Sequence, residues 1–340
     1  MADVADAAGV SKGAVSHVLN NRAGEIGPET RARILSTMRE LGYRPPPSKR
    51  VMVRGRCDTL GIVMGCRAAE LTKPSYYNMV FESILLQTEA RNLNVTLYTG
   101  SIFEIDTLDK IRYYCDGRCD GLLLFGTRAN SPLPIALAER AVPFVVIGDS
   151  AERPGTTCVD VDNADGVRML IKLLVNLGHK RFAFVIGPEY VTSAQHRHEA
   201  FLSIMASSGM TGYSLPVVKE PNDQIMRDWL KSIMSLPLAE RPTAILGWND
   251  QAAHLIIDVM TGMGLKVPAD VSVVGFDDAW YAIPDKSPRL TTYRQPFSDI
   301  GRRAVELCLE RFEETIAESY VEVIPGKLIV RQTSGPAPSI

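Results

Sequence analysis

Residues 3–21 read DVADAAGVSKGAVSHVLNN, and this stretch decides the fold of the N-terminal part of the chain. Residues 3–9 open with an acidic side chain and end at Gly9, which predicts a short Ala-rich helix. Ser11 is well placed to cap a second helix over 12–20. Val15, Val18 and Leu19 share one face of that second helix, because residues three and four apart are neighbours on a helix. Two short helices joined by a glycine-containing turn are typical of a helix-turn-helix unit.

A third helix is expected to begin at Gly27-Pro28, with proline at its first position. Gly42 ends it, and Tyr43 is placed to fold back as an apolar contact. A generic three-helix bundle has similar apolar spacing, so spacing alone leaves both interpretations open. The buried stripe expected for the third helix is Ile34, Leu35, Met38 and Leu41.

The charge of this 340-residue chain is unevenly distributed. Residues 1–56 carry ten Lys and Arg against five Asp and Glu, whereas the remainder carries 27 against 34. A small basic head suits a polyanionic partner, although a solvated basic surface gives the same count. With 46% hydrophobic and 22% charged residues, the composition is that of a soluble protein of two or three domains. No membrane span or export signal is seen, and the six scattered cysteines predict reduced thiols in a cytoplasmic protein.

The order and spacing of these N-terminal motifs resemble the lactose/galactose repressor (LacI/GalR) family. The resemblance rests on residues 3–21, on Pro28-Glu29-Thr30-Arg31 and on Leu41-Gly42-Tyr43-Arg44-Pro45. It implies a DNA-binding headpiece over 1–46. Several residues that the family has before Asp3, including a threonine cap, are missing, so we expect the chain to be clipped or mis-started there. Ala14 stands where the family usually has threonine, which removes one phosphate-contacting hydroxyl.

The resemblance makes the second helix the recognition helix, with Lys12, Gly13 and His17 at the base-reading positions. Lys12 can donate to guanine, and His17 can donate or accept according to its tautomer, unless it is a surface histidine without a role. Gly13 has no side chain and permits close approach. The DNA contacts expected in the headpiece are Ser11, Lys12, Gly13, Ala14, Ser16, His17, Asn20, Arg22, Arg31 and Tyr43.

Residues 47–56, PSKRVMVRGR, lie in an expected hinge or linker over 47–58. Two valines and its short length make it a poor independent helix. The resemblance implies a hinge helix that orders on operator DNA and pairs with its twin across the minor groove. Met52 falls at the position of the wedge that enters between base pairs, flanked by the phosphate-neutralising Lys49, Arg50 and Arg54. A plain basic linker is the alternative.

From Thr59 onward, short apolar strands alternate with amphipathic helices, which predicts parallel α/β sheets with ligands at the carboxyl ends of the strands. No Gly-x-Gly-x-x-Gly or P-loop motif signals a nucleotide enzyme. Strands are expected at 60–64, 95–98, 121–125, 144–147, 181–186, 244–246 and 271–275, with helices such as 79–92, 166–177 and 251–263.

Motifs in the body extend the family resemblance to about Arg331. They are residues 159–163, 177–181, 249–250, 272–278, 290–292, 295–296 and Gly301. What they imply is an α/β, two-lobed periplasmic-binding-protein-like domain over 59–340, with parallel sheets and three crossovers. Its N-lobe is expected at about 59–158 and 291–323, and its C-lobe at about 159–290 and 324–340.

The same resemblance implies an effector cleft between the lobes. An Arg fork, an Asn amide and a carboxylate can pair with neighbouring sugar hydroxyls, while aromatic faces pack on the ring. Each contact has a plainer alternative, such as helix-start packing for the two tyrosines or a loop end for the aspartate. Gly148 stands where the family often has a carboxylate. The expected effector contacts are Tyr76, Tyr77, Gly148, Asp149, Arg197, Trp248, Asn249 and Asp277.

No catalytic, metal or cofactor site is predicted. Ser193, His196 and His198 lie close in sequence but lack a nucleophile elbow. The histidines flanking Arg197, and the pair Cys115 and Cys119, lack a complete set of metal ligands.

These observations predict a regulator, by default a repressor, that binds a near-palindromic double-stranded operator as a homodimer and responds to a carbohydrate effector. No leucine-heptad tail follows Arg331, which favours a dimer over a tetramer. A nucleobase or other metabolite as ligand, and activation in place of repression, stay open. A free-standing sugar receptor would carry an export signal and lack the head, and a sugar-processing enzyme needs paired acids in the cleft.

Overall fold

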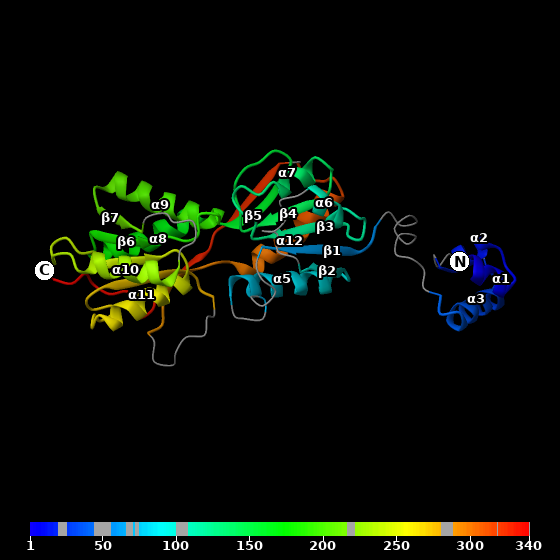
Figure 1. Ribbon diagram of the computed structural model, residues 1–340, viewed down its shortest axis with the longest axis horizontal. Helices are drawn as coiled ribbons and strands as arrows, with labels where there is room; N and C mark the ends of the chain where they lie inside the picture. The colour runs from blue at the N-terminus through cyan, green and yellow to red at the C-terminus, as the bar shows by residue number, and fades with distance from the viewer. Residues whose placement is uncertain are drawn as a thin grey trace.

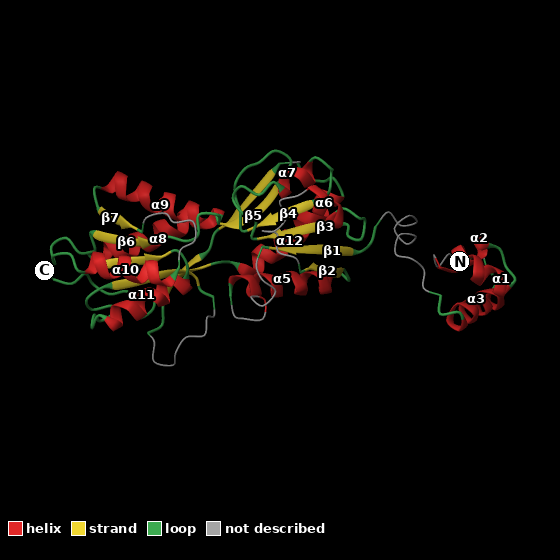
Figure 2. Cartoon of the chain, viewed as in Figure 1, coloured by secondary structure: helices red, strands yellow, loops and turns green. Residues whose placement is uncertain are grey.

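The computed structural model of the protein describes residues 1–19, 26–43, 56–65, 71, 75–99, 108–215, 222–279, 288–317 and 319–339. The described residues form a helical headpiece and an α/β body with two lobes (Figures 1 and 2). Within them no helix is both long and apolar enough to cross a membrane.

The headpiece contains the three expected helices, α1 (Ala2–Ala8), α2 (Lys12–Leu19) and α3 (Pro28–Glu40). Gly9 ends α1 in the left-handed conformation, with φ 63°. The predicted cap of α2 is confirmed, because the Ser11 hydroxyl accepts a hydrogen bond from the Ala14 amide at 3.1 Å. The buried core of this unit comprises Val4, Ala5, Ala8, Val15, Val18 and Ile34.

The expected buried stripe of α3 is partly wrong. Leu35 and Leu41 are 37% and 51% exposed, whereas Thr37 is buried and its hydroxyl donates to the Arg33 carbonyl at 3.0 Å. The headpiece core contacts only a narrow face of α3. Thr37 and Met38, three and four residues after Ile34, share that face with it, whereas Leu35 does not. Tyr43 follows α3 and packs against the same core, as expected.

The first lobe is built on a six-stranded sheet in which all neighbours are parallel. Helices α5 (Tyr76–Ala90) and α12 (Phe297–Phe312) cover one face, and α6 (Leu108–Tyr114) and α7 (Leu133–Ala138) cover the other. In spatial order the strands are β11 (Tyr320–Ile324), β5 (Thr157–Val161), β4 (Phe144–Ile147), β3 (Gly121–Phe125), β1 (Thr59–Met64) and β2 (Asn94–Tyr98).

The second lobe has a six-stranded sheet of its own, parallel except for β12 at one edge. Figure 1 shows α8 (Asn163–Asn176) and α9 (Thr192–Ser208) on one side of it, and α10 (Asp223–Met234) and α11 (Asp250–Gly262) on the other. In spatial order the strands are β12 (Lys327–Ile329), β10 (Thr291–Arg294), β9 (Ser272–Asp277), β8 (Ala244–Gly247), β6 (Arg181–Val185) and β7 (Thr211–Ser214).

The chain passes between the lobes three times: between β5 and α8, between β10 and α12, and between β11 and β12. Three of the expected boundaries shift by a few residues, the third only because β11 keeps Ile324 in the first lobe. Strand β5 extends the first lobe to Val161, and β10 keeps 291–294 in the second lobe, because this strand pairs with β9 and the Tyr293 ring is fully buried there. The crossovers bring the carboxyl ends of both sheets toward each other.

Candidate functional site

A cavity of about 320 Å³ lies between the lobes, where the strands of both sheets end. This size and location are typical of a small-molecule site in an α/β fold. The first lobe supplies Gly65, Ser75, Tyr76, Tyr77, Gly126, Thr127, Ile147, Gly148 and Asp160. The second lobe supplies Pro188, Tyr190, Val191, Ser193, Arg197, Trp248, Asn249, Gln251 and Asp277, and Gln295 lies in the crossover after β10.

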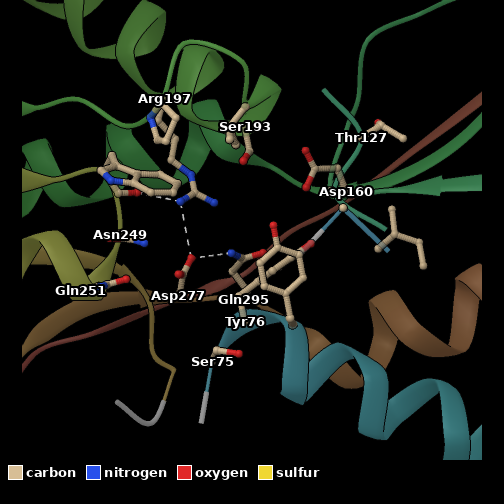
Figure 3. A pocket seen from close by; sticks show the side chains of 18 of the residues that line it. Ser75, Tyr76, Thr127, Asp160, Ser193, Arg197, Asn249, Gln251, Asp277 and Gln295 are labelled. Carbon is tan, nitrogen blue, oxygen red and sulfur yellow. Dashed lines mark hydrogen bonds and ion pairs between the residues drawn. The ribbon is translucent and has the colours of Figure 1, made fainter. Parts of the chain in front are cut away.

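Arg197 on α9 is the fixed centre of the second-lobe wall, and only 3% of it is exposed. Its Nε donates to Asn163 Oδ1 and its Nη1 to the Trp248 carbonyl, both at 2.7 Å. The guanidinium carbon lies 3.7 Å from the centroid of the Phe276 ring, a cation–π arrangement. Figure 3 shows the other terminal nitrogen of Arg197 directed into the cavity, ready to donate to a ligand.

Asp277, at the end of β9, lies beside Arg197 with Oδ1 3.5 Å from Arg197 Nη1. The same oxygen accepts from Gln295 Nε2 at 2.6 Å. Asp277 and Asp278 have φ values of 124° and 56°, conformations that are costly for residues with side chains and that cluster at functional sites. Arg294 and Arg331 bind the Asp278 carboxylate at 2.7 and 2.6 Å, which anchors this strained turn.

Tyr76 and Tyr77 reach the cavity because α5 begins three residues earlier than the periodicity predicts. The Ser75 hydroxyl caps the helix by accepting from the Asn78 amide at 3.3 Å. Both rings pack edgewise or tilted on Phe125, so helix-start packing and cavity lining are both correct descriptions. The Tyr76 hydroxyl is buried without a hydrogen-bond partner among the described residues, and burial raises the pKa of this phenol well above its ordinary value.

Gly148 lines the cavity and has φ 78°. A Cβ at this position would lie 2.7 Å from the Tyr76 hydroxyl oxygen. Glycine at 148 therefore provides both the backbone conformation and the space that Tyr76 fills.

Asp149, an expected effector contact, does not line the cavity. Its side chain is 1% exposed and pairs with Arg153 at 2.9 Å, while Oδ1 accepts from the Ala151 amide. The positive φ of Gly148 turns the chain as β4 ends, and the carboxylate of Asp149 is directed to the loop that follows.

The wall contains further polar residues that were not predicted as effector contacts, among them Asp160 and Gln295. Asp160 follows Val159 in β5 and lies on the strand next to Gly148, whose amide donates to the Val159 carbonyl at 3.0 Å. Burial raises the pKa of Asp160 to about 7, although nearby Arg197 opposes this effect. An acidic residue inside a buried strand is the signal that could have found Asp160. Gln295 lies in a motif of the family resemblance, but its place in the wall depends on where the crossover puts it.

The two lobes also touch at one side of the cavity. The Ala129 amide donates to the Tyr190 carbonyl at 3.0 Å, and the Arg128 guanidinium lies over the Tyr190 ring at 5.0 Å. Ser150 Oγ lies 3.2 Å from His196 Nδ1. These contacts join the walls across the opening between the lobes.

The side chains weighed as catalytic or metal-binding candidates have other partners. His196 contacts Ser150, whereas His198 contacts Ser214 at 3.0 Å and stacks on Phe184. Ser193 lines the cavity, whereas neither histidine is among its lining residues. Among the described residues, no group of three or more His, Cys, Asp or Glu is placed to hold a metal ion.

In the headpiece, the residues at the start of α2, where base contacts are expected, are open to solvent. Ser11, Lys12 and Gly13 are exposed, and a Cβ at Gly13 would meet only the Ser11 hydroxyl, at 3.6 Å. The other expected DNA contacts that are described, all half-buried, are Ala14, Ser16, His17, Arg31 and Tyr43. Asn20, Arg22, Lys49, Arg50, Met52 and Arg54 lie outside the described residues.

Comparisons with known proteins agree with this architecture. A family model described as bacterial regulatory proteins, lacI family, matches residues 1–46, and one described as a periplasmic binding protein-like domain matches 171–334. The HTH-type transcriptional regulator CelR of Thermobifida fusca is 28% identical over 333 residues, covering 97% of this chain and 96% of that protein. The HTH-type transcriptional repressor PurR of Photobacterium profundum is 26% identical over 343 residues, covering 97% of each.

Solved structures show the same fold. A transcriptional regulator CelR–cellobiose complex is 25% identical with a TM-score of 0.68, covering 97% of this chain and 98% of that one. A lac repressor dimer bound to operator and the anti-inducer ONPF gives a TM-score of 0.75 at 22% identity, covering 98% of each chain. Headpiece, two-lobed body and matches together define a DNA-binding transcriptional regulator. The chain belongs to the lacI family of bacterial regulatory proteins.

Proposed function

We propose that this regulator is a cytoplasmic repressor that binds a near-palindromic operator as a homodimer and is controlled by a sugar or glycoside held between its lobes. The wall around Arg197 is the observation that carries the effector site. It presents a fixed guanidinium, the Asp277 carboxylate and the Trp248 ring around one cavity. Donor, acceptor and aromatic face are what a sugar ring with several hydroxyls requires.

The related CelR complex with cellobiose supports a carbohydrate ligand. A nucleobase is the second candidate, because Trp248 and the two tyrosines can also stack on a flat heterocycle and a relative is a PurR repressor. We propose no catalytic role for the cavity.

On the DNA side, we propose that Lys12 and His17 contact base edges while Gly13 permits close approach of the helix. The hinge over 47–58, with Met52 as its wedge, stays a prediction from the sequence. Ligand binding alters how the lobes sit and thereby shifts the hinge between its ordered and disordered states. The coupling cannot exceed the ligand's differential affinity for those states, typically ~1–3 kcal/mol.

A thermal-shift screen of monosaccharides, disaccharides and nucleobases tests the effector class. DNA selected from a random pool, with binding followed by fluorescence anisotropy, then tests control by the compound found. Arg197→Ala should remove the response of DNA binding to that compound, because Asp277 and the ligand both lose their fixed donor. A matched control is Arg168→Ala on α8, whose side chain is 60% exposed.

DNA affinity and ligand response are measured separately in both variants. DNA affinity close to that of the unmodified protein shows that the Arg197→Ala headpiece and dimer are intact. A normal ligand response in that variant would contradict the proposed site. Stabilisation by nucleobases alone would replace the sugar with the second candidate.

A further inference from the structure

The charge balance of the cavity wall points to a narrower ligand class. Among the described lining residues there are two carboxylates, Asp160 and Asp277, and one basic group, Arg197. Arg197 lies against Asp277 at 3.5 Å, whereas no basic side chain lies within ion-pair distance of Asp160 in the described part of the chain. With both aspartates ionised, the wall carries one net negative charge.

The Asp160 carboxylate has hydrogen-bonding capacity left over. Its Oδ1 accepts from the Val161 amide and its Oδ2 from Asn163 Nδ2, both at 2.8 Å. A carboxylate offers about four acceptor positions, so about two are unused. Asp160 is 1% exposed, and a buried charge with unused acceptors is costly unless a partner supplies donors.

Three neighbouring polar atoms in the wall are also unsatisfied. The Tyr76 and Thr127 hydroxyls and Gln295 Oε1 are buried without hydrogen-bond partners among the described residues. Figure 3 shows the Tyr76 hydroxyl rising toward the side on which Asp160 lies. The wall thus offers the Tyr76 and Thr127 hydroxyls together with two groups that only accept hydrogen bonds, the Asp160 carboxylate and Gln295 Oε1. This set favours a ligand that carries several donors of its own, such as vicinal hydroxyls.

We propose that Asp160 is the specificity-determining residue of this cavity, accepting hydrogen bonds from ligand hydroxyls and excluding phosphorylated or otherwise anionic ligands. The inference rests on the proposed function, since it takes the cavity as the effector site. It narrows the effector to an uncharged polyhydroxy compound. A phosphate placed against Asp160 would meet a like charge that no described basic residue offsets by an ion pair.

Because Asp160 can be protonated, its proposed role in ligand binding should make the ligand affinity depend on pH. Charged and titratable groups act on Asp160 from four segments: Arg197 from α9, Tyr76 from α5, Asp149 after β4 and Cys158 from β5 itself. Burial is the dominant influence and raises the pKa of Asp160 to about 7, while Arg197 lowers it. Since the ionised form accepts from the ligand, ligand affinity should rise with pH through about 7 and level off above it.

Calorimetric titration of the full chain provides the test. The probes are cellobiose, maltose, sucrose, glucose and galactose, with glucose 6-phosphate and galactose 6-phosphate as matched anions, between pH 5.5 and 8.5. Whichever neutral sugar binds is then titrated into Asp160→Asn and into the matched control Asp165→Asn, an acid on α8 outside the lining residues.

We expect the neutral sugar to bind more tightly than its phosphate and its affinity to fall as pH drops below 7. Asp160→Asn should weaken binding about ten- to a hundred-fold at pH 8 and flatten the pH profile, whereas Asp165→Asn should change neither. If Asp160→Asn binds like the unmodified protein at every pH, or a phosphate binds more tightly than its parent sugar, the role of Asp160 is overturned while effector control survives. If no neutral sugar binds at all, the proposed function falls with it.

Discussion

At the scale of single residues, the cavity depends on pairs whose members constrain each other. Gly148 leaves room for Tyr76, and Asp277 fixes Arg197 and Gln295. Arg197 and Asp277 were predicted as effector contacts from the family resemblance. Asp160 and Gln295 lie in motifs of that resemblance but were not predicted as effector contacts, since their place in the wall arises from which strand ends meet across the crossovers. Asp149 was predicted as an effector contact but does not line the cavity, because the turn at Gly148 redirects its side chain in a way that sequence does not show.

Gly148→Ala tests the first pair. The new methyl group would lie 2.7 Å from the Tyr76 hydroxyl oxygen at a backbone φ of 78°, so the tyrosine must move. We expect a loss of ~1–3 kcal/mol in unfolding free energy, measured by urea denaturation, together with weaker ligand binding. Gly262→Ala in α11 is the control, because nothing lies within 4 Å of its added Cβ and alanine favours a helix by ~1 kcal/mol. Equal stability of Gly148→Ala and the unmodified protein would refute the steric account.

The raised pKa of Asp160 should also make the stability of the ligand-free protein depend on pH. Its folded-state pKa of about 7 lies above the ordinary value of 3.8, so the folded protein holds a proton that the unfolded chain has released between those values. This group therefore reduces stability as pH rises from about 4 to about 7. The Asn side chain of Asp160→Asn cannot ionise. The difference in melting temperature between this variant and the unmodified protein should therefore shift in favour of the variant when the pH is raised from 5 to 8. A pH-independent difference would contradict the shifted pKa.

At the scale of elements, apolar runs and helix periodicity predicted most of the body correctly. The expected strands at 60–64, 121–125 and 144–147 correspond closely to β1, β3 and β4. The strands that were not predicted either contain polar residues among the apolar ones, as β5 does at Asp160, or lie at sheet edges. These are β5, β7, β10, β11 and β12. Such strands form because a neighbour in the sheet is already in place, which local sequence does not reveal.

The packing of α12 on α5 links one element to the site. A Cβ on Gly301 would lie 2.5 Å from Ser83 Oγ and 3.1 Å from the Ile84 amide nitrogen. Gly301→Val should therefore push the helices apart, destabilise the first lobe by ~1–3 kcal/mol and displace the start of α5, which carries Tyr76.

Thermal denaturation and ligand titration measure both effects. Arg302→Ala, on a side chain 41% exposed in the same helix, should leave ligand affinity unchanged. If Gly301→Val keeps full ligand affinity and stability, α5 is not positioned by this contact.

At the scale of the whole molecule, sequence motifs predicted the two lobes and their three crossovers, and the sheets confirm that topology. The boundaries moved by a few residues because a strand that continues straight into a crossover shows no change in composition. The cavity is a property of the assembled lobes: its walls come from residues separated by more than two hundred positions, such as Ser75 and Gln295.

On the proposed function, occupation of the cavity between the lobes governs how tightly the headpiece binds DNA. The direct measurement is the anisotropy of a labelled duplex selected from a random pool, titrated with protein at fixed salt, with and without a saturating sugar already shown to bind. We expect the sugar to change the DNA affinity by about 5- to 150-fold in the unmodified protein and to leave it unchanged in Arg197→Ala. An identical DNA affinity with the cavity filled and unfilled would contradict it.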